Sequence, residues 1–95
     1  MKPGNNINPS DDLYRAILTL ETVDECKKFL VDLCTRTELS ALEQRFQAAI
    51  MLSEGKVYTD IMDATGASSA TISRVSRAIN YGDGGYATAI ERLKK

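Results

Sequence analysis

The sequence predicts an all-α domain of six helices with no sheet. Apolar residues recur three and four positions apart in one segment after another, and no segment alternates apolar and polar residues over the length of a strand. Ser, Thr and Gly residues stand where the helices would begin and end. At 95 residues the chain is a single domain whose core would be marginal for a monomer, and oligomerisation is one ordinary remedy.

Two helices are predicted in the first third of the chain. Both prolines fall within residues 1–9, which we expect to form a flexible arm, and the domain itself covers 10–95. The segment SDD at 10–12 supplies an N-cap for the helix DLYRAILTL, and Thr22 with Glu25 forms a capping box for VDECKKFLVDLC. The apolar side chains that these helices would bury are Leu13, Ile17, Leu20, Val23, Cys26, Phe29, Leu30 and Leu33.

A long helix and three shorter ones are predicted in the rest of the chain. Thr35 and Glu38 repeat the capping-box pattern, and the long helix runs to about Ser53. The segment YTDIMDAT ends at Gly66, the next helix covers about 69–80, and YATAIERLKK closes the chain. The expected inward-facing residues are Leu39, Leu42, Phe46, Ala49 and Ile50 on the long helix, Ile72, Val75 and Ile79 on the helix over about 69–80, and Tyr86, Ile90 and Leu93 on the last helix.

Composition argues against several classes of protein. The chain has no histidine, and Cys26 and Cys34, its only cysteines, do not make a zinc site, so we expect buried thiols and no metal or cofactor. No nucleophile has an evident base, so an enzyme is not expected. No run approaches the roughly 20 apolar residues of a membrane span. The N-terminus lacks the apolar core of a signal peptide, and we expect a cytoplasmic protein.

Positive charge is concentrated towards the C-terminus. The net charge is −1, but residues 66–95 hold five Lys and Arg against two Asp and Glu, whereas residues 1–65 hold seven against eleven. A local excess of cations is typical of a surface that meets a polyanion. The last third of the chain is therefore its electropositive part, although the imbalance is modest.

The two helices joined at Gly66 have the pattern of a helix-turn-helix over about 58–80. Gly66 accepts the positive φ that a tight reversal needs, and Ile61 and Ala67 can meet beneath the turn. In this motif the second helix, here about 69–80, lies in the major groove of DNA, where hydroxyls and arginines contact bases and phosphates. The residues that we expect to contact DNA are Thr59, Ser68, Ser69, Ala70, Thr71, Ser73, Arg74 and Arg77.

The segment TRTELSALEQRFQAAIMLSEG, followed by YTDIMDATGASSATISRVSRAIN, resembles the Trp repressor family, and the closing NYGDGGY is similar to its small bacterial branch often called YerC/YecD-type. The resemblance covers about residues 10–93 and implies an intertwined homodimer in which each chain presents one helix-turn-helix. It also implies a transcriptional repressor on double-stranded DNA, with half-sites ~34 Å apart. Thr59 and Met62 replace polar or charged DNA-contacting residues of the repressor, so a different operator is expected.

The same resemblance implies a tryptophan corepressor pocket, in which two arginines sandwich the indole and a threonine and a glycine shape the space. Thr35, Arg45 and Arg74 match the threonine and the arginines. Val75 stands where the glycine should be, and its isopropyl group would occupy space that the indole needs. We therefore expect no tryptophan corepressor.

Two other functions stay open at this point. The helix-turn-helix could be the scaffold of a protein-protein interaction module that binds no DNA, a reading that the low net charge favours. Alternatively, the space between Arg45 and Arg74 could bind an unidentified small ligand.

Overall fold

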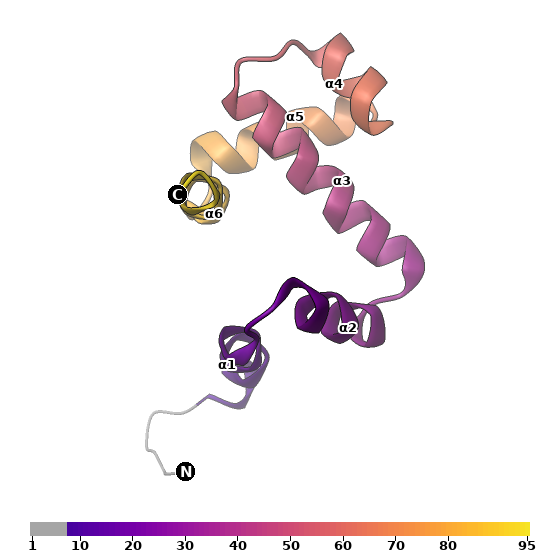
Figure 1. The fold of residues 1–95 in the computed structure, drawn as a ribbon. Helices are drawn as coiled ribbons and strands as arrows, with labels where there is room; N and C mark the ends of the chain where they lie inside the picture. Colours follow the sequence, from indigo (N-terminus) through magenta and orange to yellow (C-terminus); the bar gives the residue numbers. More distant parts are fainter. Residues whose placement is uncertain (1–7) are drawn as a thin grey trace. The chain divides into compact units, whose positions relative to one another are not determined.

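The computed structural model describes residues 8–95, which form six α-helices and one short 3-10 helix with no strand in that range (Figure 1). The elements are η1 (Pro9–Asp11), α1 (Asp12–Thr19), α2 (Val23–Leu33), α3 (Arg36–Ser53), α4 (Tyr58–Thr65), α5 (Ser69–Tyr81) and α6 (Gly85–Leu93). The predicted all-α fold is confirmed. The chain divides into two units, Met1–Arg36 and Thr37–Lys95. None of the described helices is long and apolar enough to cross a membrane.

The first helix begins differently from the prediction. Asp11 is the N-cap of α1, but its side chain accepts no capping hydrogen bond. The side-chain cap lies earlier, where Asn8 Oδ1 accepts a hydrogen bond from the Ser10 backbone N–H at 3.0 Å and starts η1. Pro9 favours this start because it has no N–H to satisfy. Of the predicted flexible arm, only Asn8 and Pro9 lie within the described residues, and they belong to η1 and its cap.

The capping box predicted before α2 is present with one of its two bonds displaced. Thr22 Oγ1 accepts a hydrogen bond from the Glu25 N–H at 3.0 Å, as expected. Glu25 Oε1 accepts its bond from the N–H of Glu21, at 2.9 Å, and not from that of Thr22. In the usual capping box this carboxylate binds the N–H of the N-cap residue itself. Here it binds the residue before the N-cap, and so links the incoming chain to the first turn of α2.

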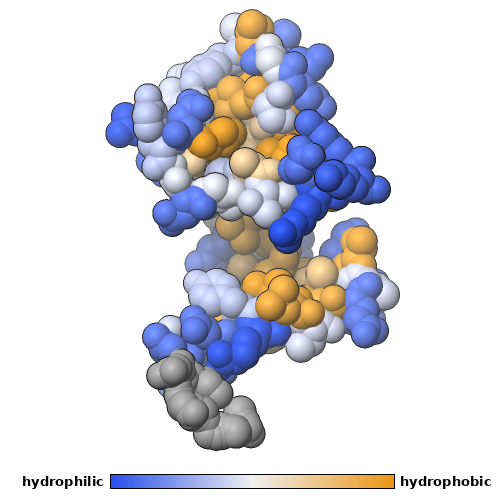
Figure 2. Space-filling view, turned by 90° about the vertical axis from the view of Figure 1, so that its left-hand side faces the viewer, coloured by the Kyte–Doolittle hydropathy of each residue, from blue (hydrophilic) through white to orange (hydrophobic). Residues whose placement is uncertain are grey.

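The unit that contains α1 and α2 buries none of its described side chains. Leu18 is 84% exposed and Val23 72% exposed, and apolar side chains reach the surface of both units (Figure 2). Cys26 and Cys34 are free thiols that are only half-buried, so the expectation of buried thiols is wrong for the single chain. Two short helices cannot enclose a core by themselves, so this unit needs a further apolar surface to pack against.

α3 carries the core of the second unit on two adjacent alanines that are fully buried. The two clusters are Ala48, Ile61, Ala67 and Ile72 in the first, and Ala49, Val75 and Ile90 in the second. Successive helical residues point about 100° apart, so Ala48 faces α4, the turn and the start of α5, while Ala49 faces the middle of α5 and α6. The second cluster extends to Phe46, whose ring stacks on Tyr86 of α6 with centroids 6.3 Å apart.

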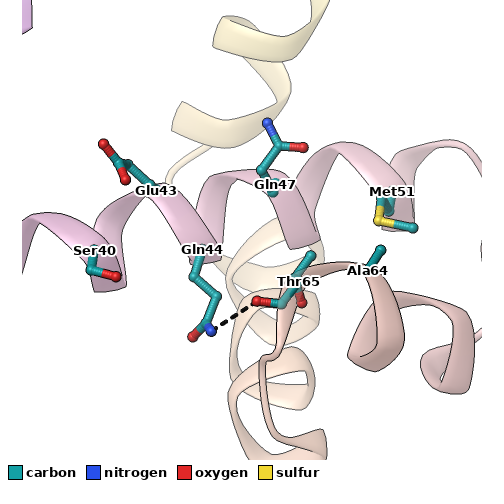
Figure 3. Close-up of a pocket in the computed structure, with 7 residues that line it drawn as sticks. All are labelled: Ser40, Glu43, Gln44, Gln47, Met51, Ala64 and Thr65. Atoms are coloured by element: carbon teal, nitrogen blue, oxygen red, sulfur yellow. Dashed lines mark hydrogen bonds between the residues drawn. The ribbon is translucent and has the colours of Figure 1, made fainter.

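A side-chain hydrogen bond joins α3 to the end of α4. Gln44 Nε2 donates to the backbone carbonyl of Thr65 at 3.1 Å (Figure 3). Thr65 is the last residue of α4, so its carbonyl has no partner within the helix. Its hydroxyl donates to the carbonyl of Ile61 at 2.7 Å and accepts from the N–H of Ala67 at 3.1 Å. Thr65 thus connects the helix end, the turn and α3.

Removing the Gln44 donor should destabilise the second unit. We expect Gln44→Ala to lower the free energy of unfolding by about 1 kcal/mol, because a half-buried carbonyl loses its partner. Gln44→Glu, which is nearly isosteric, should be at least as harmful because it places an acceptor against that carbonyl. The measurement is urea unfolding followed by circular dichroism at one fixed protein concentration.

Gln47→Ala is the matched control for this prediction. Gln47 lies on the same helix, is exposed, and points away from Thr65 in Figure 3. Its replacement should change the free energy of unfolding by less than about 0.5 kcal/mol. Equal effects of the alanine variants at 44 and 47 would contradict a stabilising role for the bond to Thr65.

Candidate nucleic-acid interface

α4, the three-residue turn and α5 form a helix-turn-helix over 58–81. Gly66 ends α4 with φ of 77°, the left-handed conformation that was predicted, and its N–H donates to the Met62 carbonyl at 2.9 Å. An L side chain at this φ would cost roughly 1–2 kcal/mol. Ser68 then starts α5, since its Oγ accepts a hydrogen bond from the Thr71 N–H at 3.1 Å. The turn is therefore fixed by the left-handed backbone of Gly66 on one side and by the side-chain cap of Ser68 on the other.

One face of α5 packs against the core of the second unit. Ile72 is 0% exposed and Val75 2% exposed, and Ile79 is half-buried beside them. These residues are spaced i, i+3 and i+7, so they form a single stripe along the helix. Full burial of an isoleucine side chain contributes about 1.5–3 kcal/mol. The stripe anchors α5 and leaves its other faces open to solvent.

Nearly all of the predicted DNA-contacting residues lie on the open faces. The exposed ones are Thr59, Ser68, Ser69, Ala70, Ser73, Arg74 and Arg77. Thr71 is half-buried beside the cap, where Ser68 Oγ and Thr71 Oγ1 are hydrogen-bonded at 3.2 Å. Either hydroxyl can supply the proton of this bond, so the other hydroxyl keeps its own proton for a further acceptor.

Positive charge on the motif lies on α5 alone. Arg74 and Arg77 are exposed, and neither forms an ion pair with any residue between 8 and 95. The ion pairs in that range are Arg15–Asp12, Lys28–Asp24 and Lys95–Glu91. α4 carries Asp60 and Asp63, both exposed, and no basic residue. An anionic partner would therefore be attracted to α5 and not to α4.

The residues matched to a corepressor pocket lie in different surroundings. Val75 is packed against Ala49 and Ile90 in the second core cluster, so its isopropyl group is part of the core. Arg74, the residue before it, is exposed, and Arg45 is half-buried on α3. Thr35 lies in the other unit of the chain.

An open pocket of about 290 Å³ lies between α3 and the end of α4, and none of the four matched residues borders it. It is lined by Ser40, Glu43, Gln44, Gln47, Met51, Ala64 and Thr65 (Figure 3). Amide and hydroxyl groups predominate, and Glu43 is the single charged side chain of the lining. The hydrogen bond from Gln44 to Thr65 forms part of its wall.

Sequence reasoning missed two residues of this region. Gln44 bonds to a carbonyl 21 residues away, and no local pattern can indicate such a partner. Tyr81 lies one residue beyond the predicted end of α5 and is 84% exposed. A signal for it existed, because Tyr81 continues the spacing of Ala70, Arg74 and Arg77 along one helical face.

Comparison with known proteins agrees with this geometry. The model of the family described as Trp repressor protein matches residues 9–94. YerC, an uncharacterised protein of Bacillus subtilis, is 48% identical over 85 residues, which are 90% of this chain and 82% of YerC.

Two solved structures have the same fold. A candidate Trp repressor from Staphylococcus aureus superposes with a TM-score of 0.86 at 44% identity, covering 90% of this chain and 86% of its own. A TrpR-like protein from Eubacterium eligens superposes with a TM-score of 0.87 at 47% identity, covering 94% of this chain and 92% of its own. Because the family model spans nearly the whole chain and the fold agrees at this identity, this protein belongs to the Trp repressor family.

Proposed function

We propose that this protein is a transcription regulator that binds a specific DNA sequence with α5 in the major groove. The observation that carries the proposal is the open face of α5, which presents two arginines that have no ion-pair partner among residues 8–95, while the opposite face is buried. Membership of the Trp repressor family supports the same function and favours repression as the direction of regulation.

The two ends of the open face suit different contacts. Ser69 and Ala70 at the start of α5 are small and exposed, so the helix can approach base edges closely, and the alanine methyl can contact a thymine methyl. Arg77, two turns further along, suits a phosphate oxygen, as does the hydroxyl proton of Thr71. Sequence preference would thus reside in the first turn of α5 and much of the affinity in its arginines.

We propose that the active form is a homodimer. The unit of α1 and α2 leaves apolar residues such as Leu13, Ile17 and Val23 exposed, and a second copy of the chain would supply the surface that covers them. A chain of this length also gains stability from association. A two-fold dimer would place two α5 helices on half-sites about 34 Å apart.

Arg77 and Ser69 should affect DNA binding in different ways. Selection from a random pool of duplexes should return a two-fold consensus for the wild type. Arg77→Ala should weaken binding to all sequences alike and reduce the slope of log affinity against log salt by about 1.8, because each of the two chains of the dimer loses one phosphate contact. Ser69→Gln should keep that slope and change the selected consensus, because it alters a side chain at the base edges.

Arg92→Ala provides the control for this pair, since Arg92 is exposed on α6, outside the open face of α5. It should leave affinity, slope and consensus as in the wild type. Failure of the wild type to enrich any sequence would refute the DNA-binding function and favour the protein-interaction module.

Charge placed on the apolar face of α1 should dissociate the dimer. We expect wild-type protein to sediment at twice the mass of the 10.4 kDa chain, and Ile17→Asp to sediment as a partly unfolded monomer, because an aspartate cannot be buried unpaired. Arg15→Asp places the same side chain on the opposite side of α1 and should leave the dimer intact. A monomeric wild-type protein with full DNA affinity would contradict the proposed assembly.

Tryptophan should not act as the effector. Val75 belongs to the packed core, so an indole ring could occupy its position only by displacing that core. Isothermal titration of the dimer with tryptophan should give no heat of binding at micromolar concentrations. Saturable micromolar binding would show that the ring is accommodated despite Val75.

A further inference from the structure

The residues of α5 that lie furthest from the core form one line along the whole helix. Ala70, Arg74, Arg77 and Tyr81 are spaced i, i+4, i+7 and i+11, so their side chains share a face, which we call the outer line of α5. All four are exposed. The buried stripe of Ile72, Val75 and Ile79 lies on the opposite side of the helix. The outer line is thus a continuous surface with two cations in its middle and a tyrosine at its end.

Tyr81 is exposed, and the segment that follows it has few side chains that could cover the ring. The side chain is 84% exposed, and its hydroxyl makes no hydrogen bond with the described part of the chain. Gly82 ends α5, and a Cβ at this position would lie 2.4 Å from the Ala78 carbonyl oxygen, so no side chain can stand there beside the ring. Two further glycines, Gly84 and Gly85, follow within the next three residues. Asp83 is the single side chain of this segment.

The length of the outer line decides what Tyr81 can reach. From Ala70 to Tyr81 the helix rises about 16 Å, at ~1.5 Å per residue. The major groove of DNA is only about 12 Å wide. If the start of α5 enters the groove and Ala70 lies at the base edges, as in the proposed function, Tyr81 lies beyond the groove floor, at the wall formed by phosphates and sugars.

We propose that Tyr81 is a further DNA-contacting residue, whose phenolic hydroxyl donates a hydrogen bond to a backbone phosphate at the edge of each half-site. The arginines beside it on the outer line make a polyanion the fitting partner, since Arg74 and Arg77 supply charge and the phenol supplies a neutral donor. A phenol does not displace a condensed counterion, so its contribution is independent of salt. This inference rests on the proposed DNA-binding function.

The test compares Tyr81→Phe with the wild type on two labelled duplexes, the selected consensus and a scrambled sequence, over a series of salt concentrations. We expect Tyr81→Phe to lower affinity for both duplexes by roughly fivefold to a hundredfold, the effect of two lost hydrogen bonds, one in each half-site. The slope against salt should be unchanged, in contrast to Arg77→Ala. Sedimentation and the urea midpoint should match those of the wild type, because the hydroxyl is solvent-exposed in the free protein.

Tyr14→Phe is the matched control, since Tyr14 is also an exposed tyrosine but lies on α1. It should leave both affinities unchanged. Wild-type affinity in Tyr81→Phe would overturn the proposal, and so would a loss confined to the consensus duplex, which would indicate a base contact. A change in oligomeric state would place Tyr81 in a subunit contact and equally overturn it.

The failure of this inference can be told apart from failure of the proposed function. If the wild type binds neither duplex in the low-salt buffer, the DNA-binding function itself is wrong. If the wild type binds with a steep salt slope and Tyr81→Phe binds equally well, the function stands and the role of Tyr81 does not.

Discussion

The packing of α5 against two buried alanines of α3 is the interaction on which the rest of the second unit depends. Ala48 and Ala49 are small enough to let Ile72 and Val75 approach the axis of α3 closely, and burial of these side chains contributes several kcal/mol in total. Since this attachment uses one side of α5, the other sides carry no packing requirement. Residues there can change without loss of the fold, which suits a surface that has to match one particular partner.

The two units of the chain differ in how they use apolar residues. The second unit encloses its apolar side chains in two clusters, whereas the first leaves its leucines and valines in contact with water. In the proposed homodimer, folding and association would be coupled, because a second copy of the chain would supply the surface that covers the first unit. Stability would therefore depend on protein concentration, and the helix-turn-helix could be more resistant to unfolding than the segment that precedes it.

Helix positions, the turn at Gly66 and the buried stripe of α5 could be predicted from the sequence because each depends on residues a few positions apart. Sequence reasoning missed contacts whose partner is distant or depends on side-chain geometry. The bond from Gln44 to Thr65 joins residues 21 positions apart on two helices, and the bond from Ser68 Oγ to Thr71 Oγ1 is not specified by the capping pattern. The exposure of α1 and α2 could not be predicted either, since periodicity shows which face is apolar but not what covers it.

The carboxylates of Asp60 and Asp63 on α4 have a consequence for how such a regulator would find its target. Their two negative charges equal in number the two positive charges on α5, so the helix-turn-helix has no net charge. Its attraction to arbitrary stretches of duplex would therefore be weak. A genome offers millions of competing stretches, and a protein that binds them poorly is not sequestered by them. Modest absolute affinity would then be compatible with high occupancy of a rare operator, even when few copies of the protein are present in the cell.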